Sequence, residues 1–150
     1  MLKEGDKAPD FKLPDHKGNI ISLKDFKGKK IILYFYPKDN TSGCTKEACD
    51  FNESLPDIES KNAIVIGISP DSLDSHKKFA EKYNLNFYLL SDESKETLQK
   101  YGVWKEKSMY GKKYLGVERT TFIIDEKGVI NKIYPKVKVP GHVKEVLKDI

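Results

Sequence analysis

Apolar and polar residues follow one another along the chain in blocks that predict both strands and helices. Short runs of β-branched and aromatic residues, bounded by Gly, Pro, Asn or Asp, are typical of strands. Strands are expected at residues 11–13, 20–22, 31–36, 63–69, 87–90, 120–124 and 129–134. Helix-like runs that follow capping residues or end at a glycine are expected at residues 44–60, 73–83, 92–101 and 143–150, with a short helical turn or loop at 23–28. Ser91 or Asp92 is the expected cap of the third helix.

The order of these elements predicts an α/β fold. The runs at 31–36 and 63–69 are apolar on both faces, as expected of central strands in a covered parallel sheet. A strand–helix–strand–helix–strand series gives parallel strands, and the hairpin at 120–134 adds an antiparallel edge. We therefore expect a thioredoxin-like fold, with a central mixed β-sheet flanked by helices and an N-terminal β-hairpin extension at 8–22. No linker or repeat interrupts residues 1–150, so a single domain is expected.

The segment 103–118 is the exception, because neither a helical nor a strand period appears in it. It nevertheless carries large apolar and aromatic side chains, at Trp104, Met109, Tyr110, Tyr114 and Leu115. Connections of this length are usually functional or disordered, and the aromatic content favours a functional connection.

Charge and composition argue against two classes of partner. Charged residues make up 33% of the 150 residues, and the net charge is only +4 because 27 basic residues are scattered among 23 acidic ones. That mixture is typical of a solvated surface and not of a nucleic-acid site. No apolar run reaches the ~18 residues of a membrane span, and the polar N-terminus shows no signal-peptide pattern. A cytoplasmic protein without a nucleic-acid or membrane partner is expected.

Both cysteines of the chain lie at the start of a predicted helix. The strand at 31–36 ends at Pro37, which has no N–H for a β-ladder, and turn-forming residues at 39–43 lead to Cys44. A helix N-terminus carries about half a positive charge and unpaired N–H groups, which stabilise a thiolate. Cys49 follows five residues later. In a reducing compartment such cysteines are more often catalytic, metal-bound or inert than a structural disulfide.

The residues alone leave other roles to weigh for these cysteines. Zinc is disfavoured because none of the histidines, His16, His76 and His142, stands at a metal-finger spacing from Cys44 or Cys49. A thioredoxin-type dithiol needs two residues between its cysteines, and this chain has four. Inert packing stays open at this point, because free cysteine packs as a small apolar residue.

The surroundings of Cys44 favour a reactive thiol. Pro37, Thr41 and Cys44 form the pattern P-x-x-x-T-x-x-C, which puts the Thr41 hydroxyl about one helical turn from the thiol. Arg119 is the single arginine beside 26 lysines. Its planar fork of donors can hold a thiolate and a substrate oxygen together, which a lysine cannot do. Chance codon usage is the alternative explanation for this arginine.

The segment F-Y-P-K-D-N-T-S-G-C-T-K-E-A-C-D-F, residues 35–51, resembles the active-site signature of peroxiredoxins. More narrowly, it resembles the bacterioferritin-comigratory, or Q-type, branch, whose second cysteine follows the first by five. The resemblance covers nearly the whole chain, with the motifs G-D-K-A-P-D-F (5–11), I-G-I-S-P-D (66–71), Y-G-V-W-K-E-K (101–107), R-T-T-F-I-I-D (119–125) and G-H-V-K-E-V-L (141–147). Ser42 departs from it, because this branch usually has proline there. That departure concerns the stiffness of the loop and not the chemistry.

The resemblance implies a thiol peroxidase that reduces hydrogen peroxide and organic hydroperoxides. It makes Cys44 the peroxidatic cysteine, Cys49 the resolving cysteine, and Pro37, Thr41 and Arg119 supporting residues. It also implies an internal Cys44–Cys49 disulfide, a thioredoxin-like protein as reductant, a monomer, and no metal, haem or flavin cofactor. A thiol–disulfide oxidoreductase and a non-enzymatic thioredoxin-fold binding module or holdase are the alternative functions.

Helix geometry adds an expectation about the reaction cycle. Cα atoms five residues apart in an α-helix are separated by roughly 8.6 Å. A disulfide tolerates a Cα separation of no more than about 7 Å. If Cys44 and Cys49 lie on one intact helix, that helix must unwind before they can bond.

Overall fold

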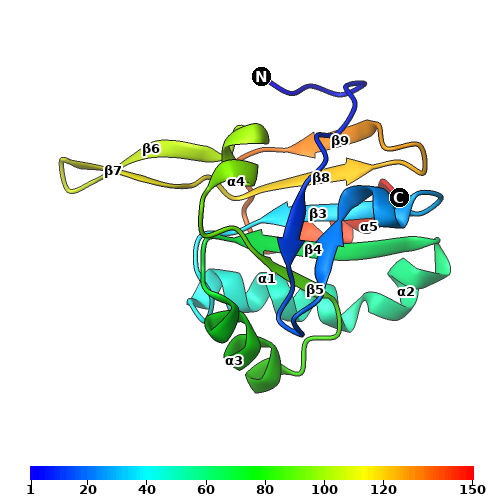
Figure 1. Ribbon diagram of the computed structural model, residues 1–150, viewed down its shortest axis with the longest axis horizontal. Coiled ribbons are helices and arrows are strands. Elements are labelled where there is room, and N and C mark those ends of the chain that lie inside the picture. The colour runs from blue at the N-terminus through cyan, green and yellow to red at the C-terminus, as the bar shows by residue number, and fades with distance from the viewer.

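The computed structural model describes residues 1–150 and has a five-stranded sheet at its centre (Figure 1). The strands, in chain order, are β3 (Lys30–Phe35), β4 (Ala63–Ser69), β5 (Tyr88–Ser91), β8 (Thr120–Ile124) and β9 (Ile130–Tyr134). They lie side by side in the order β5-β4-β3-β8-β9. Strands β3, β4 and β5 are parallel, whereas β8 pairs antiparallel with both β3 and β9. The expected mixed α/β sheet is therefore confirmed.

One face of the sheet is covered by helices. Ile32 and Tyr34 of β3 point to this face and pack with buried side chains of the helices, among them Phe51, Phe79 and Val146. The helices are α1 (Ser42–Glu53), α2 (Leu55–Ser60), α3 (Leu73–Tyr83) and α5 (His142–Lys148). Because successive residues of a strand face opposite ways, the apolar residues 31–35 of β3 contribute side chains to both faces of the sheet.

The other face is covered mainly by the N-terminal segment. Ile31 and Leu33 of β3 point to this face and pack in a second apolar cluster with Leu13, Ile21 and Leu98. Figure 1 shows the N-terminal strands crossing in front of the sheet, with α5 behind it. The elements on this face are β1 (Lys12–Pro14), β2 (Ile20–Ser22), the 3₁₀-helix η1 (Leu23–Phe26) and α4 (Glu96–Lys100). The predicted N-terminal β-hairpin is confirmed by the antiparallel pairing of β1 with β2.

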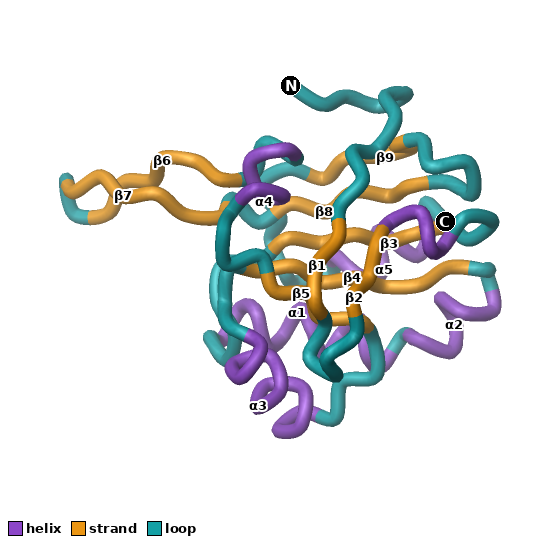
Figure 2. Tube along the Cα trace, in the orientation of Figure 1, coloured by secondary structure: helices purple, strands orange, loops and turns teal.

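The segment 103–118, in which the sequence shows neither a helical nor a strand period, forms a hairpin. Strands β6 (Trp104–Met109) and β7 (Lys112–Val117) pair antiparallel along their full length and extend away from the body of the molecule (Figure 2). Tyr110 and Gly111, with φ of +52° and +76°, form the two-residue turn that such hairpins require. The outer half is exposed on both faces, so no alternation of apolar and polar residues marks it.

Two predicted helices have different bounds. The helix expected at 44–60 is two helices, separated at Ser54, because Pro56 has no N–H with which to continue the first. The helix expected from Asp92 begins only at Glu96. Ser91 is still part of β5, where it pairs with Ser69 of β4. Asp92 lies before the helix, and its carboxylate accepts the N–H of Leu98 at 2.8 Å. No helix of the chain has both the length and the apolar character needed to cross a membrane.

Candidate active site

Cys44 lies at the N-terminus of α1, as the sequence predicted. Thr41 is the N-cap, with extended backbone angles, and Cys44 is the third helical residue. The first N–H groups of a helix have no partner within it, and the helix dipole adds positive potential there. The side chain of Cys44 is only 1% exposed, so little water screens that potential. Both cysteines are free thiols.

Arg119 contacts the sulfur of Cys44 directly. Its Nη2 donates to Cys44 Sγ at 3.3 Å, and its Nη1 donates to Glu47 Oε1 at 2.7 Å. Arg119 follows β7 and precedes β8, so the pairing of β8 with β3 brings it from 75 residues away in sequence. An added Cβ at Gly43 would lie 3.2 Å from Nη2, so a glycine there leaves room for the guanidinium. The guanidinium thus contacts the Cys44 sulfur, as the sequence led us to expect, and its second partner is the Glu47 carboxylate, which the sequence analysis did not name.

Glu47 is a site residue that the sequence analysis missed. It is fully buried, and its Oε2 has no hydrogen-bond partner within the protein. Burial raises the pKa of the Glu47 carboxyl to about 7, even though the adjacent Arg119 acts to lower it. A signal for this residue existed, because Glu47 stands among apolar residues on the buried stripe formed by Cys44, Ala48 and Phe51. An acid on such a stripe needs a cation beside it.

The guanidinium of Arg119 is stabilised by both of its partners. Burial alone would lower its pKa, but the Glu47 carboxylate and the Cys44 sulfur together raise the pKa above its ordinary value. Arg119 therefore stays charged, and it offers that charge to the thiol while Glu47 holds its other nitrogen.

Cys49 lies on a different side of α1 from Cys44 and is partly exposed. Burial, followed by the nearby carboxylates of Glu53 and Asp50, raises the pKa of its thiol, and Lys46 only partly opposes them. The two cysteines therefore differ in their surroundings, because only Cys44 contacts a cation. Since α1 is continuous from Ser42 to Glu53, the structure keeps both on one intact helix.

Thr41 and Pro37 lie in the loop that precedes α1. The Thr41 hydroxyl donates to the carbonyl of Lys38 at 2.9 Å and makes no bond to Cys44. Pro37 follows the end of β3 and is half-buried. Of the five residues predicted for the site, the structure thus brings Cys44 and Arg119 into contact. Pro37 and Thr41 lie in the preceding loop, and Cys49 lies further along α1.

A family model described as AhpC/TSA matches residues 4–133 of the chain. The chain belongs to this family. Peroxiredoxin Bcp of Bacillus subtilis is 49% identical over 149 residues, which cover 99% of this chain and 95% of that protein. A putative peroxiredoxin Bcp of Coxiella burnetii is 54% identical over 146 residues, or 97% of each chain. The resemblance to the Bcp branch of the peroxiredoxins is confirmed.

Solved structures support the same assignment. PrxQ of Xylella fastidiosa superposes with a TM-score of 0.94 at 38% identity, covering 99% of this chain and 95% of that one. The bacterioferritin comigratory protein of Xanthomonas campestris, studied for alkyl peroxide reduction, gives a TM-score of 0.89 at 40% identity, with 93% and 88% covered. The chain is therefore a peroxiredoxin, a thiol peroxidase with the thioredoxin-like fold. Family membership decides between the functions that the sequence left open.

Lys107 is a second residue near Cys44 that the sequence analysis missed. It lies on β6 in the hairpin and is half-buried. Burial and the positive charge of Arg119 lower the pKa of its ammonium group, whereas Glu118 and Cys44 act to raise it. The hairpin therefore adds a cation to the electrostatic field of the thiol. Nothing in the aperiodic sequence of this segment placed Lys107 near Cys44.

Proposed function

We propose that Cys44 is the peroxidatic cysteine of this peroxiredoxin. Its thiolate attacks one oxygen of a hydroperoxide, and the S–O bond forms as the O–O bond breaks. The sulfur loses two electrons and becomes a sulfenic acid, while the leaving alkoxide or hydroxide takes up a proton. The observation that supports this role is the contact of Arg119 with both Cys44 and Glu47.

Arg119 stabilises negative charge at two points of this step. Before the reaction it donates to the thiolate, and in the transition state the charge moves onto the leaving oxygen. Glu47 holds the guanidinium through Nη1, so that Nη2 stays aimed at the sulfur. The N–H groups at the start of α1 and the hydroxyl of Thr41 are the other donors that we assign to the peroxide, and Pro37 shields the thiolate from water.

Cys49 is the resolving cysteine in this proposal. Its thiol attacks the sulfenic sulfur of Cys44, which forms a disulfide and releases water. Because α1 spans both residues, their Cα atoms are roughly 8.6 Å apart, beyond the limit of about 7 Å for a disulfide. The first turns of α1 must therefore unwind in each catalytic cycle.

An outside dithiol completes the cycle by thiol–disulfide exchange. We assign this role to a thioredoxin-like protein, and the reaction to a reducing compartment such as the cytoplasm. Since both cysteines belong to one helix, the disulfide needs no second subunit. A monomer with a single catalytic domain over residues 1–150 is sufficient, and the scheme uses no metal or organic cofactor.

Single-cysteine variants test these roles. Cys44→Ser should consume no peroxide, because a serine hydroxyl is barely ionised at neutral pH. Cys49→Ser should consume about one equivalent and stop at a sulfenic or sulfinic acid. Mass spectrometry of the wild type after about one equivalent should show the loss of two hydrogens, the signature of a disulfide. A Cys44→Ser variant that still turns over once, beside an inactive Cys49→Ser variant, would reverse the assignments.

A further inference from the structure

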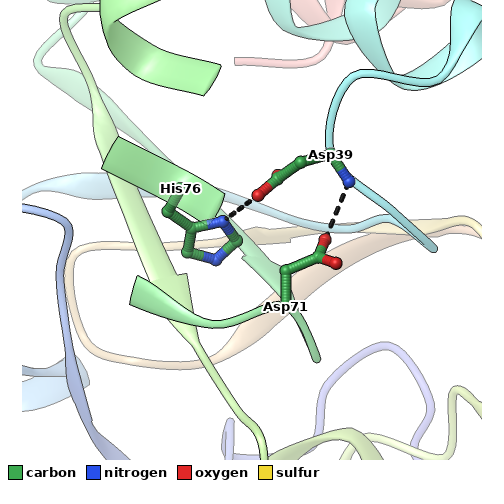
Figure 3. A group of neighbouring side chains, drawn as sticks. All are labelled: Asp39, Asp71 and His76. Atoms are coloured by element: carbon green, nitrogen blue, oxygen red, sulfur yellow. Dashed lines mark hydrogen bonds and ion pairs between the residues drawn. The ribbon is translucent and has the colours of Figure 1, made fainter. Parts of the chain in front are cut away.

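Asp39 is a buried carboxylate in the loop between β3 and α1, and both of its oxygens have hydrogen-bond partners. The hydroxyl of Tyr36 donates to Oδ1 at 2.6 Å. The hydroxyl of Ser75 lies 2.8 Å and Nδ1 of His76 lies 2.6 Å from Oδ2. Figure 3 shows the imidazole of His76 pointing at this carboxylate. Charge-assisted bonds of this kind are among the strongest that a side chain can make.

His76 is itself held from its other side. Its Nε2 lies 2.9 Å from the carbonyl oxygen of Leu90, which can only accept. Nε2 therefore carries a hydrogen, and Nδ1 faces the Asp39 carboxylate. His76 is fully buried, so the orientation of the ring is set by these two bonds. The position of Asp39 thus depends on α3, which carries His76, and through it on β5.

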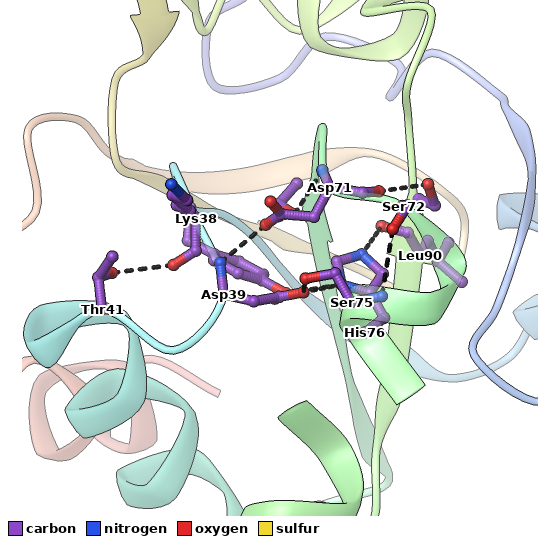
Figure 4. A network of polar contacts seen from close by, with 11 residues as sticks. Lys38, Asp39, Thr41, Asp71, Ser72, Ser75, His76 and Leu90 are labelled. Carbon is purple, nitrogen blue, oxygen red and sulfur yellow. Dashed lines mark hydrogen bonds and ion pairs between the residues drawn. The ribbon is translucent and has the colours of Figure 1, made fainter. Parts of the chain in front are cut away.

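Asp71 fixes the backbone of the same loop. Its Oδ2 accepts the N–H of Asp39 at 2.7 Å and the hydroxyl of Ser69 at 2.8 Å. Ligand atoms of Asp39, Asp71 and His76 lie within 4.8 Å of one another, close enough for a metal ion. Hydrogen bonds within the protein already engage the carboxylate of Asp39 and both nitrogens of His76, however. We therefore interpret the group as a hydrogen-bonded anchor (Figure 4).

All four hydrogen bonds of this group to Asp39 come from outside α1. Their donors and acceptors lie in Tyr36 after β3, in Asp71 after β4, and in α3. The Cys44 half of α1 is attached differently. Between residues 42 and 49, the side-chain hydrogen bonds to other elements all go to Arg119. The chain on the two sides of Cys44 is thus held by separate sets of contacts.

We propose that Asp39, Asp71 and His76 form a loop anchor that keeps residues 37–41 in place while α1 unwinds and rewinds. The inference rests on the proposed function, in which α1 must unwind before Cys44 and Cys49 can form a disulfide. The anchor holds the loop from which that helix starts. Asp39 and His76 are then positioning residues. They act on Cys44 through the loop, by fixing the point from which the helix starts.

The anchor makes opposite predictions for the two chemical steps. Asp39→Asn keeps the backbone N–H bond to Asp71 but presents an NH₂ group to donors that need a carboxylate. Oxidation of Cys44 should slow by about 10- to 100-fold, because a misplaced nucleophile reacts poorly. Disulfide formation should be at least as fast as in the wild type, because a less firmly held loop does not hinder the unwinding of α1. Consequently, less of the variant should be over-oxidised to sulfinic acid at high peroxide concentration.

Stopped-flow fluorescence of Trp104 and mass spectrometry of the quenched products measure the two steps. Asp74→Asn is the matched control, since Asp74 is an exposed carboxylate on α3 that pairs only with Lys78. It should leave both rates unchanged. Equal slowing of both steps in Asp39→Asn would indicate a general loss of structure and overturn the positioning role, as would an oxidation rate within about twofold of the wild type.

Hydrogen exchange of the wild type tests the anchor without any substitution. In the disulfide form, amides in the first turns of α1 should lose protection, whereas the amide of Asp39 should keep it. Loss of protection at Asp39 in a protein that forms the Cys44–Cys49 disulfide overturns the anchor alone. Absence of that disulfide after peroxide treatment would instead overturn the proposed function.

Discussion

Two buried carboxylates lie on either side of Cys44, and their surroundings differ sharply. Asp39, in the loop before the cysteine, accepts side-chain bonds from Tyr36, Ser75 and His76. Glu47, one helical turn after it, accepts one bond from Arg119 and leaves Oε2 without a partner. Both are largely removed from water, with exposed fractions of 7% and 0%.

The difference bears on the proposed unwinding of α1. A buried polar group whose bonds are all made resists displacement, whereas an unsatisfied one carries a cost of about 1–3 kcal/mol that exposure to water relieves. Unwinding α1 would bring the free oxygen of Glu47 into solvent and leave Asp39 undisturbed. In the proposed cycle the loop is therefore the fixed side of Cys44, and the helix is the side that opens.

Removing the arginine fork should have the largest effect on this arrangement. Arg119→Lys keeps a positive charge but has only one nitrogen, so it cannot hold Glu47 and Cys44 at the same time. We expect oxidation of Cys44 to slow by about one to three orders of magnitude, or roughly 1.4–4 kcal/mol of transition-state stabilisation. Rapid-mixing measurement of the first step checks this. Wild-type rates would show that charge alone is enough.

Glu47→Gln should change the pH dependence of stability. The pKa of the Glu47 carboxyl is raised from 4.5 to about 7 in the folded protein. Between those values the folded state binds more protons than the unfolded state, so the free energy of unfolding falls as pH rises. The wild type should lose on the order of 3 kcal/mol over this range relative to the variant. Urea titrations at several pH values measure the free energy of unfolding of both proteins. If the two free energies change with pH in parallel, the prediction is wrong.

Formation of the disulfide should reduce the helix content of α1 only. When the Cys44–Cys49 disulfide forms, far-ultraviolet circular dichroism should lose part of the signal of α1, because its first turns unwind. The spectrum should recover when dithiothreitol reduces the disulfide. Cys49→Ser is the control, since it accepts the same oxidant without bridging. An unchanged spectrum in the oxidised wild type would mean that the helix stays intact.

The exposed contact between Asn40 of the loop and Tyr83 of α3 should contribute least to holding the loop. Tyr83 donates to Oδ1 of Asn40 at 3.0 Å, and this contact is exposed. Tyr83→Phe removes the hydroxyl and should lower the free energy of unfolding by less than about 1 kcal/mol. The rate of Cys44 oxidation should stay within about twofold of the wild type. A larger loss would place part of the anchor at Asn40 and not only at the buried Asp39.

Much of the fold and the position of Cys44 followed from local sequence. The apolar run at 31–36 predicted β3, and the proline and turn residues after it predicted that Cys44 begins a helix. These features depend on backbone conformation and burial within a few residues. The hairpin of β6 and β7 escaped prediction for the converse reason, because strands exposed on both faces leave no periodic pattern.

The sequence by itself thus determined the strands of the central sheet, the family and the place of Cys44 near the start of a helix. Only the tertiary structure decided which side chains surround Cys44 and the loop before it. Arg119 meets Cys44 across 75 residues because β8 pairs with β3, and His76 meets Asp39 across 37 residues because α3 packs beside the loop. Whether a charged group is satisfied depends on what packs against it, which no local pattern records. Asp39 and Glu47 are both acids in the same short segment, and only the fold gives the oxygens of Asp39 their donors and leaves Oε2 of Glu47 without a partner.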